Sequence, residues 1–388
     1  MAGKAKKVLI IGAYGCGNKG DDAILKAIVS RFSSFEITAT SGRADNIGKW
    51  LGINTTPLRL NEGINKSVFL SMFPNCIRIL FHLIRSNALF FGGGGLMHDM
   101  TPYNLPFMFM WHSLAKLFGK NVYYISIGVG PIKTNAGKKL CARRLKRADG
   151  LFPRDEHGLN LLKSMGIETA RLSCDAVFVQ ERESGVMPLK FKGIELPAKG
   201  YLTVTASQWF EAVNFWERDR LDFSTKKEIL INGIKNAIRI YGMPAVFVPT
   251  VVHDFLLAKE IEPLFEKGTY YVMPYEGSSL FSMVSAIENS HFLLGMRMHS
   301  MIFAARAAVP FVALVYDTKV QSLLEWLNIT HLGVTLGDAT NEKVARLIET
   351  SKQEHGAISN GLNERVSFMS KIVVQQMNDV ADEITSIK

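Results

Sequence analysis

The stretch VLIIGAYGCGNKGDDAIL, residues Val8–Leu25, decides how the chain begins to fold. A β-branched apolar run breaks at Gly12, and a loop follows whose glycines are Gly15, Gly17 and Gly20. Two acids then open an Ala/Ile/Leu-rich segment with helical spacing. The pattern predicts a strand, a tight loop and a helix N-terminus, an arrangement in which backbone N–H groups face an anion or a polar ligand.

Length and cysteine content set the class of protein. The 388 residues are enough for two domains of about 150–200 residues each. The four cysteines lie far apart and form no CxxC pair, so neither a structural zinc nor a disulfide framework is expected. The apolar run near the N-terminus is too short for a signal peptide. We therefore expect reduced thiols and a cytoplasmic location.

The formal charge of +10 favours anionic partners, which would be small ligands, nucleic acid or an anionic membrane surface. A solvated basic surface explains the same charge equally well. The sequence holds no zinc finger, RNP aromatic pattern or helix-turn-helix signal, so nucleic acid is not an expected partner. No His/Asp/Glu cluster has the spacing of a tight metal site, and no metal is expected.

Short apolar runs alternate with helix-like segments along the chain, which favours parallel sheets covered by helices on both faces. In such sheets ligands bind at the carboxyl ends of the strands. The expected strands are Val8–Ile11, Glu36–Ala39, Ala88–Phe91, Val122–Ile127, Gly150–Pro153, Leu202–Ala206, Ala245–Pro249, Tyr270–Met273, Phe292–Gly295 and Phe311–Val315.

A polar, proline-containing stretch, QERESGVMPLKFKGIELPAKG, reads as a linker between two halves. We therefore expect an N-terminal α/β domain at residues 1–185 and a C-terminal α/β domain at residues 186–388. Each would be a doubly wound, Rossmann-like domain, with an interdomain cleft between them.

The apolar segment Ser67–Leu96 is interrupted by Pro74, Arg78, His82 and Arg85, so a membrane-spanning helix is not expected. The two arginines and the histidine share one helical face. An ordinary amphipathic core helix explains this pattern. The alternative is a basic face that makes peripheral contact with a membrane, at its inner face, where a lipid-linked acceptor would lie.

The second glycine-rich motif is FFGGGGLMHD, residues Phe90–Asp99. Four consecutive glycines after a buried strand are costly in chain entropy and allow the backbone to approach a ligand closely. The glycines expected to bind substrate are Gly93, Gly94 and Gly95. His98 and Asp99 follow at once as candidates for proton transfer. A glycine turn beside an incidental surface histidine is the alternative.

The third motif is FLLGMRMHS, in which Arg297 and His299 follow a strand and precede a small-residue helix. Arginine grips phosphate or carboxylate with two parallel hydrogen bonds. A histidine two residues away can add a hydrogen bond or move a proton near neutral pH. This motif therefore predicts an anion-binding and proton-transfer site.

Further polar residues follow other expected strands. Arg154 is a second candidate for gripping an anion, although a surface ion pair or a helix cap would explain it as well. Lys319 lies in the loop VYDTKV, and His253 and Asp254 end the stretch VPTVVHD. Each signal alone is weak, and their shared position at strand ends is what points to one site.

Other phosphate-binding and catalytic motifs fit poorly. GxxxxGK[ST] and GxSxG are absent, which excludes a P-loop ATPase and a nucleophile elbow. Gly15, Gly17 and Gly20 match GxGxxG, but the expected second strand ends in Thr40 and Ser41 rather than in an acid. The signal for a dinucleotide is therefore weak.

With these motifs the chain resembles the polysaccharide pyruvyl transferase family from about Val8 to about Trp326. The stretches that carry the resemblance are GAYGCGNKGDDAIL, FFGGGGLMHD, SIGVGP, PRDEHGLNLLKSMGI, CDAVF, GMRMHSMIFAARAAVPFVAL and YDTKV. The first stretch and GMRMH are specific as a pair, whereas the glycine run alone is not.

The resemblance implies a glycosyltransferase-B-like fold of two α/β domains. It implies phosphoenolpyruvate as co-substrate, no other cofactor, and an acceptor sugar in a surface glycan or its lipid-linked precursor. Arg297 and His299 would contact the donor, and Arg154 and His98 would line the same cleft. One departure is that family members often carry an arginine near the position of Ser207, where this chain reads VTASQ.

Ketal formation from phosphoenolpyruvate requires a proton at the methylene carbon, attack by a sugar hydroxyl and departure of phosphate. Arginines would hold the anions, and His299 would hold phosphate or protonate the leaving group. The candidate bases are His98, Asp99 and Asp21, although an acid at the position of Asp21, taken by itself, is more often a helix cap. The residues expected to bind substrate through the loops are Gly15, Gly17, Asn18, Gly93, Gly94, Gly95 and Lys319.

Two other functions fit part of the pattern. A nucleotide-sugar glycosyltransferase would need an acid for the ribose and an aromatic residue for the base, for which Glu288 and Trp326 are candidates. A non-catalytic scaffold of glycan assembly would explain the missing arginine near Ser207, but the retained Arg297 and His299 argue against it. The sequence gives no indication of the oligomeric state.

Overall fold

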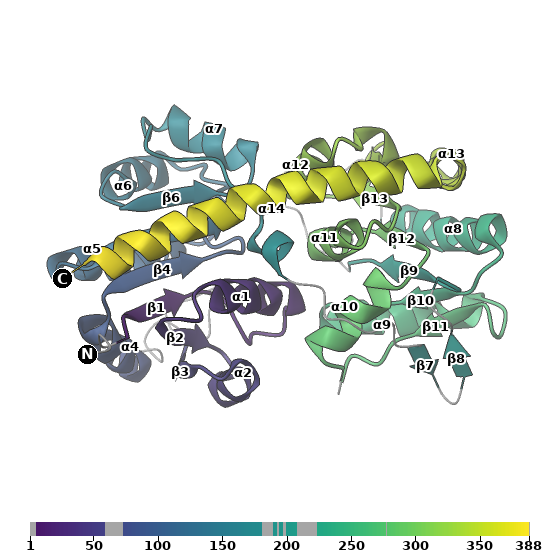
Figure 1. The fold of residues 1–388 in the computed structure, drawn as a ribbon. Helices are drawn as coiled ribbons and strands as arrows, with labels where there is room; N and C mark the ends of the chain where they lie inside the picture. Colours follow the sequence, from purple (N-terminus) through teal and green to yellow (C-terminus); the bar gives the residue numbers. More distant parts are fainter. Residues whose placement is uncertain are drawn as a thin grey trace. The chain divides into compact units, whose positions relative to one another are not determined.

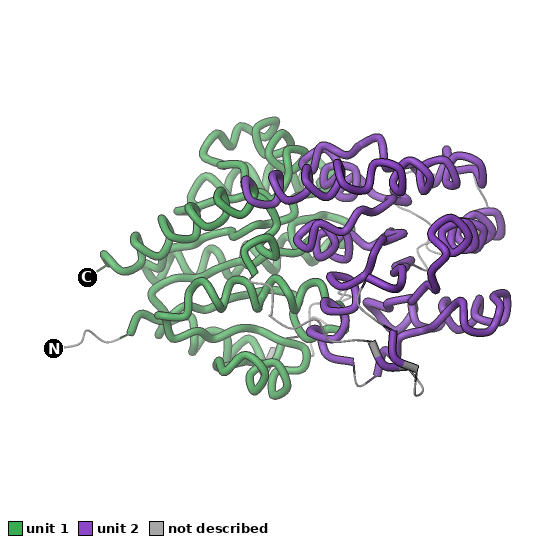
Figure 2. The backbone as a smooth tube through the Cα atoms, turned by 45° about the vertical axis from the view of Figure 1, so that its right-hand side comes forward, with its two compact units in different colours: residues 1–180, 369–388 green, residues 181–368 purple. Residues whose placement is uncertain are grey.

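The computed structural model describes residues 5–58, 73–180, 189–191, 194–196, 199–207, 223–276 and 278–387. The chain divides into two compact units, one formed by residues 1–180 and 369–388 and the other by residues 181–368 (Figure 2). The expected boundary at residue 185 lies outside the described residues. The last twenty residues belong to the first unit, whereas we expected them in the second domain.

The first unit is built on a six-stranded sheet whose paired strands are all parallel (Figure 1). Its strands are β1 (Lys7–Ile11), β2 (Glu36–Ser41), β3 (Asn54–Pro57), β4 (Ala88–Gly92), β5 (Asn121–Ile127) and β6 (Gly150–Pro153). They follow the order β3-β2-β1-β4-β5-β6, which is that of a dinucleotide-binding Rossmann fold.

The second unit repeats this topology. Its strands are β9 (Leu202–Thr205), β10 (Ala245–Phe247), β11 (Tyr270–Val272), β12 (Phe292–Gly295), β13 (Phe311–Val315) and β14 (Gly333–Thr335). Their order is β11-β10-β9-β12-β13-β14, again with parallel pairing. The expected class of two Rossmann-like α/β domains is therefore confirmed.

Helices connect the parallel strands, as crossover connections in such sheets require. In the first unit they are α1 (Lys19–Arg31), α2 (Ala44–Leu51), α4 (Phe73–Arg85), α5 (Asn104–Leu117), α6 (Asn135–Leu145), α7 (Glu156–Ser164) and the 3₁₀ turn η1 (Ala176–Val179). In the second unit they are α8 (Phe223–Tyr241), α9 (Val252–Ile261), α10 (Leu280–Glu288), α11 (Met298–Arg306), α12 (Thr318–Leu327) and α13 (Asn341–Gln353). The long helix α14 (His355–Ser386) carries the chain back to the first unit.

The expected linker contains a short hairpin. Within it, β7 (Leu189–Phe191) and β8 (Ile194–Leu196) pair in antiparallel fashion. The stretch is therefore not a plain connection where the structure describes it.

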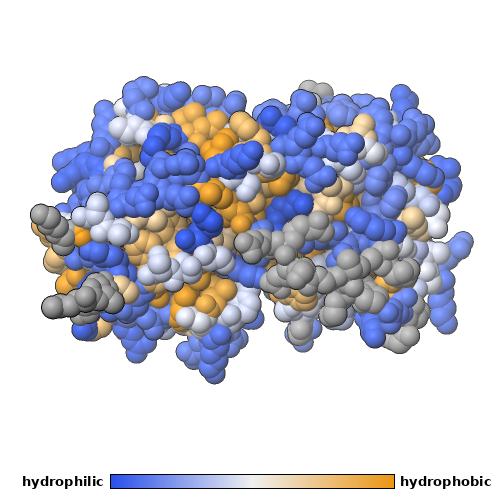
Figure 3. Space-filling view, in the orientation of Figure 1, coloured by the Kyte–Doolittle hydropathy of each residue, from blue (hydrophilic) through white to orange (hydrophobic). Residues whose placement is uncertain are grey.

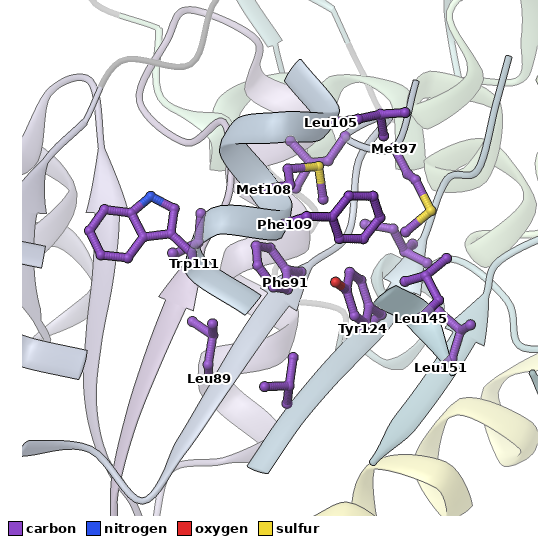
Figure 4. Packing of buried hydrophobic residues seen from close by; sticks show 14 of the residues in the cluster. Leu89, Phe91, Met97, Leu105, Met108, Phe109, Trp111, Tyr124, Leu145 and Leu151 are labelled. Atoms are coloured by element: carbon purple, nitrogen blue, oxygen red, sulfur yellow. The ribbon is translucent and has the colours of Figure 1, made fainter. Parts of the chain in front are cut away.

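The central strands are buried on both faces, which explains why they read as continuous apolar runs. On one face of the first sheet Phe91 stacks on Tyr124 with ring centroids 4.7 Å apart. Figure 4 shows Phe109 and Trp111 of α5 among the buried residues of this cluster. On the other face Phe90 packs edge-on against Phe32. Because side chains pack against both faces of this sheet, the positions of the strand ends are fixed. The positions at which the following loops begin are therefore fixed as well.

Within the described residues, none of the helices combines the length and the apolar character needed to cross a bilayer. No group of three or more His, Cys, Asp or Glu residues in the same part of the chain is arranged to hold a metal ion.

Candidate functional site

The glycine run after β4 is shaped by packing against the first helix. Gly93 and Gly94 have φ angles of +52° and +69°, which favour glycine. A Cβ on Gly93 would lie 2.1 Å from Cγ2 of Ile24, and one on Gly92 would lie 2.3 Å from the hydroxyl of Tyr14. We expected this run to exist for a ligand, whereas close approach to α1 explains most of it. Gly95 alone has open space around it.

The same run joins the loops that follow two other strands of the first sheet. The carbonyl of Gly94 accepts a hydrogen bond of 2.8 Å from the N–H of Gly128, which follows β5. A Cβ on Gly128 would in turn lie 3.0 Å from Nη2 of Arg154, which follows β6. On the other side, a Cβ on Gly94 would lie 3.1 Å from Oδ1 of Asp21. The first sheet therefore brings Asp21, the glycine run and Arg154 together at its carboxyl edge.

The first loop is closed by its own polar side chains. Asn18 caps α1, because its Oδ1 accepts a hydrogen bond from the N–H of Gly20 and its Nδ2 donates to Asp21 over 2.9 Å. The cap is therefore Asn18 and not Asp21. Gly15 has a φ angle of +63°, and its N–H donates to Asp22 over 2.7 Å. That N–H is thus taken up inside the loop, whereas we expected the N–H groups of this loop to face an anion or a polar ligand.

Asp22 is a residue that the sequence did not single out for chemistry. Burial raises its pKa to about 6, the neighbouring charge of Asp21 raises it as well, and the hydrogen bond from Gly15 lowers it. A carboxyl group that titrates near neutral pH can donate or accept a proton there. The only signal in the sequence was a pair of adjacent acids after a glycine loop.

His98 and Asp99 have different surroundings. Nδ1 of His98 accepts a hydrogen bond of 3.3 Å from the N–H of Met100. Burial lowers the pKa of His98, and the charge of Asp99 opposes this. The imidazole is therefore neutral at pH 7 and suited to accept a proton.

The carboxylate of Asp99 ties down the loop before α6. It accepts hydrogen bonds from the N–H groups of Lys133 and Thr134 and from the hydroxyl of Thr134, over 2.7–2.9 Å. Burial raises the pKa of Asp99, but these bonds outweigh it and hold the pKa below its usual range. These contacts occupy the carboxylate of Asp99, which makes His98 the better candidate base of this pair.

Arg154 is held in a buried ion pair. Its Nη1 lies 3.1 Å from Oδ2 of Asp175, and both side chains are almost fully buried. The neighbouring Asp155 caps α7 by accepting a hydrogen bond of 2.7 Å from Gly158. Nε of Arg154 also lies 3.8 Å from Oδ2 of Asp155. The Arg–Asp pair that we weighed as an alternative is thus present with both acids, and it lies in the interior rather than on the surface.

In the second unit Arg297 lies at the carboxyl edge of the sheet and occupies the N-cap position of α11. Its Nε donates to Oδ2 of Asp254 over 3.1 Å, and its Nη2 donates to Oδ1 of the same carboxylate. Asp254 is fully buried in α9 and also accepts hydrogen bonds from the hydroxyl and the N–H of Thr250. The guanidinium is therefore oriented by a carboxylate that is itself fixed.

This ion pair crosses the end of the first strand of the second sheet. Arg297 follows β12 and Asp254 follows β10, and β9 lies between these two strands. The chain leaves β9 through Ala206 and Ser207, which are small and fully buried. The resemblance leads us to expect an arginine near Ser207, so in this chain small residues follow β9, between the strands that lead to Arg297 and Asp254.

In the stretch GMRMHS, buried and half-buried side chains alternate along the chain. Met296 and Met298 are buried, whereas Arg297 and His299 are half-buried. His299 lies in the first turn of α11, where the helix dipole favours negative charge. The sequence therefore presents the arginine and the histidine at the same helix N-terminus while the methionines fill the core.

Three other candidates have local partners. Lys319 pairs with Asp317 over 3.0 Å, and both side chains are about one-third exposed. Glu288 is buried and pairs with Arg306 over 3.5 Å. A buried acid that is paired with an arginine is unsuited to hydrogen-bond the ribose of a nucleotide sugar, which is the role for which Glu288 was a candidate. That expectation is therefore wrong. Trp326 is half-buried on α12, and its carbonyl accepts a hydrogen bond from Arg365.

The candidate residues thus form two groups, each at the carboxyl edge of its own sheet. A model of the polysaccharide pyruvyl transferase family matches residues 18–318 of the chain. The chain belongs to the polysaccharide pyruvyl transferase family. In this transferase the matched range contains His98, Arg154, Arg297 and His299, whereas Lys319 lies just outside it.

Solved structures similar to the transferase share its two-domain fold. The UDP-GlcNAc 2-epimerase from Neisseria meningitidis bound to UDP-GlcNAc is 12% identical, with a TM-score of 0.61 over 96% of this chain and 100% of that one. A glycosyltransferase from Rickettsia africae is 11% identical, with a TM-score of 0.60 over 99% and 100%. Anabaena Alr3699/HepE in complex with UDP and glucose is 12% identical, with a TM-score of 0.59 over 98% and 100%. At these identities the likeness establishes the glycosyltransferase-B type of fold.

Proposed function

We propose that this transferase moves the pyruvyl group of phosphoenolpyruvate onto two hydroxyls of a sugar in a surface polysaccharide or its lipid-linked precursor. The products are a cyclic ketal and phosphate. The observation that carries the proposal is the guanidinium of Arg297, held by the buried Asp254 at the carboxyl edge of the second sheet, in a chain of this family.

Phosphoenolpyruvate carries a carboxylate and a phosphate, so its site needs oriented cations and N–H donors. An arginine has five N–H donors in a planar fork, and Asp254 engages two nitrogens of Arg297. A carboxylate behind an arginine fixes the direction of the fork, which lowers the cost of ordering it around an anion. The N-terminus of α11 adds a favourable field at the same place.

The reaction can be followed bond by bond. The C=C electron pair of phosphoenolpyruvate takes a proton at the methylene carbon, and the first sugar oxygen bonds to the central carbon while its proton passes to a base. The bond from that carbon to the phosphate oxygen then breaks, and the electron pair leaves with phosphate. The second hydroxyl oxygen bonds to the same carbon and loses its proton.

Three groups suit these proton transfers. His299 would protonate the departing phosphate from its place beside Arg297. His98, whose pKa is lowered by burial, would accept the hydroxyl proton. Asp22, whose pKa burial raises to about 6, would supply or accept a proton near neutral pH. These roles require residues of both units to meet at one substrate. The proposal therefore includes the interdomain cleft that we expected from the sequence.

The test is phosphate release by the purified chain supplied with phosphoenolpyruvate and a panel of lipid-linked and nucleotide-activated sugars. We expect release with one acceptor class and a product heavier than the acceptor by one pyruvic acid minus one water. Arg297→Lys should abolish most of this release, while Arg346→Lys on the exposed side of α13 should not. Background release with every acceptor would contradict the proposal.

A nucleotide-sugar glycosyltransferase is the second candidate, because HepE of the same fold holds UDP and glucose. The burial of Glu288 against Arg306 counts against it. Thermal unfolding separates the two functions. A rise in Tm with UDP or GDP and none with phosphoenolpyruvate would favour the glycosyltransferase.

A further inference from the structure

Helix α4 exposes large apolar side chains on a protein whose other apolar residues are mostly buried. Ile77, Phe81 and Ile84 are 60%, 53% and 47% exposed. Their spacing of four and three residues places them on one face of the helix. The opposite face holds Ile79 and Leu83, which are fully buried in the core of the first unit. The helix is therefore apolar on both sides, which an ordinary amphipathic core helix is not. Hydrophobic residues also reach the surface on the face drawn in Figure 3.

The exposed face of α4 is basic as well as apolar. Arg78 and Arg85 are exposed and lie beside the apolar stripe, each next in sequence to one of its end residues, Ile77 and Ile84. The guanidinium of Arg85 stacks over the ring of Phe81 at 4.6 Å. The helix contains no acidic residue. When an arginine side chain packs on aromatic or aliphatic neighbours, its methylene groups cover apolar surface and its charged guanidinium stays in contact with water.

Among the residues that the structure describes, the charged groups of other elements near this helix include Lys7, Glu36 and Asp45. Burial lowers the pKa of His82, and Arg85 and Lys7 lower it further while Glu36 opposes them, so His82 is neutral at pH 7. A groove of about 500 Å³ separates α4 from α2 and β3. Its lining includes Asp45 opposite Ile77, Arg78, Phe81 and His82. The positive charge of the face at pH 7 therefore comes from its two arginines.

We propose that α4 docks the protein on an anionic phospholipid bilayer. Ile77, Phe81 and Ile84 enter the boundary between headgroups and acyl chains, and Arg78 and Arg85 pair with lipid phosphates. The charge of the face selects this occupant, since an apolar stripe bordered by arginines, on a helix without acidic residues, is complementary to an anionic interface. The net charge of +10 adds a long-range attraction to the same surface.

The experiment is co-sedimentation of the full chain with vesicles of phosphatidylcholine alone and with vesicles that contain phosphatidylglycerol. We expect binding to the anionic vesicles that weakens as salt is raised. The triple variant Ile77→Ser, Phe81→Ser, Ile84→Ser should bind at least about tenfold more weakly. The double variant Arg78→Glu, Arg85→Glu should lose a similar factor and most of the salt dependence.

The matched control removes the same number of exposed apolar side chains elsewhere. Leu117, Leu264 and Phe368 are at least half exposed and lie on other elements, so changing all three to serine should leave vesicle binding unchanged. Equal binding by the α4 variants and the wild type would overturn the proposal, as would equal binding to neutral vesicles.

Sedimentation equilibrium supplies a further check, because loss of a dimer in the α4 variants without any change in lipid binding would make a second copy of the chain the occupant. No substrate is needed, so the result is independent of the proposed reaction.

Discussion

Arg297 shows how one residue type acquires a role through a distant partner. The sequence places it after a strand beside His299, and this predicts an anion site. Its orientation, however, depends on Asp254, which lies 43 residues earlier in the chain. The sequence showed Asp254 only as one weak strand-end acid, because nothing in the spacing says that β10 and β12 lie on either side of β9.

The Arg297–Asp254 pair makes a prediction about catalysis. Arg297→Lys should lower kcat/KM at least about 100-fold, since a lysine cannot reproduce the fork. Asp254→Asn should raise the KM for phosphoenolpyruvate about tenfold with a smaller effect on kcat, because the guanidinium stays charged but loses its orientation. Steady-state phosphate release measures both. Lysine is preferred to alanine at position 297, because alanine would leave Asp254 as an unpaired buried carboxylate. Equal loss of kcat and kcat/KM in Asp254→Asn would assign it a different role.

Asp22 makes a prediction about pH. Its pKa is about 6 in the folded protein and about 3.9 in the unfolded chain, so the unfolded chain ionises first. The free energy of unfolding therefore falls as pH rises from about 4 to about 6. Asp22→Asn should remove this dependence and stabilise the protein at pH 7 by about 1–2 kcal/mol. Urea unfolding of both proteins at pH 4.5 and 7 measures the difference. A variant that is less stable at pH 7 would show that the charged form is the favoured one.

At the scale of elements, most strands were predictable and a few were not. All ten predicted strands are present, with ends within two residues of the expected ones, because strands buried on both faces are written as apolar runs. The edge strands β3 and β14 were missed, since NTTP is polar and GVT is short. The hairpin of β7 and β8 was missed because its charged residues resemble a linker.

The glycine run after β4 shows where sequence reasoning about the site fails. Consecutive glycines are compatible with a ligand or with a neighbouring side chain, and only the position of Ile24 distinguishes them. The catalytic candidates in the run's vicinity were correctly associated with strand ends. The different roles of Asp21, Asp22 and Asp99 were not predictable, because each role depends on the backbone N–H groups from which the carboxylate accepts hydrogen bonds.

Two glycine substitutions in that run test this explanation. Gly93→Ala should lower the free energy of unfolding by about 2–4 kcal/mol, because its Cβ would overlap Ile24 and its φ angle is left-handed. Gly95→Ala meets nothing within 4 Å and should change stability by less than about 1 kcal/mol. Chemical unfolding measures both. If Gly95→Ala nevertheless lowers phosphate release, the open position faces substrate. Equal stability of the two variants would contradict the packing explanation.

For the whole molecule, α14 is the feature that ties sequence-distant parts together. Its second half carries an apolar stripe of Met369, Val373, Met377, Val380 and Ile384, all buried. Residues 369–388 belong to the first unit, and Tyr123 of β5 donates a hydrogen bond to Glu383. The sequence analysis did not identify this stripe, and spacing alone does not show which sheet it covers, since the partner strands lie in the other half of the chain.

The stripe makes a prediction about stability. Met377→Ala should lower the free energy of unfolding of the first unit by about 2–3 kcal/mol, because it leaves a cavity under α14. Lys371→Ala on the exposed side of the same helix should have little effect. Urea unfolding followed by near-UV circular dichroism, to which the buried aromatic rings of both units contribute, compares the two variants. No loss in Met377→Ala would show that α14 is dispensable for the first unit.

The return of α14 to the first unit also has a consequence for biosynthesis. Domains generally fold in the order in which the ribosome delivers them. Here the strands of the first sheet emerge early, but the helix that shields part of their apolar surface is translated only after the entire second unit. Nascent chains halted before residue 369 should therefore hold an incompletely covered sheet, and they should depend on chaperones until the final turns of α14 arrive.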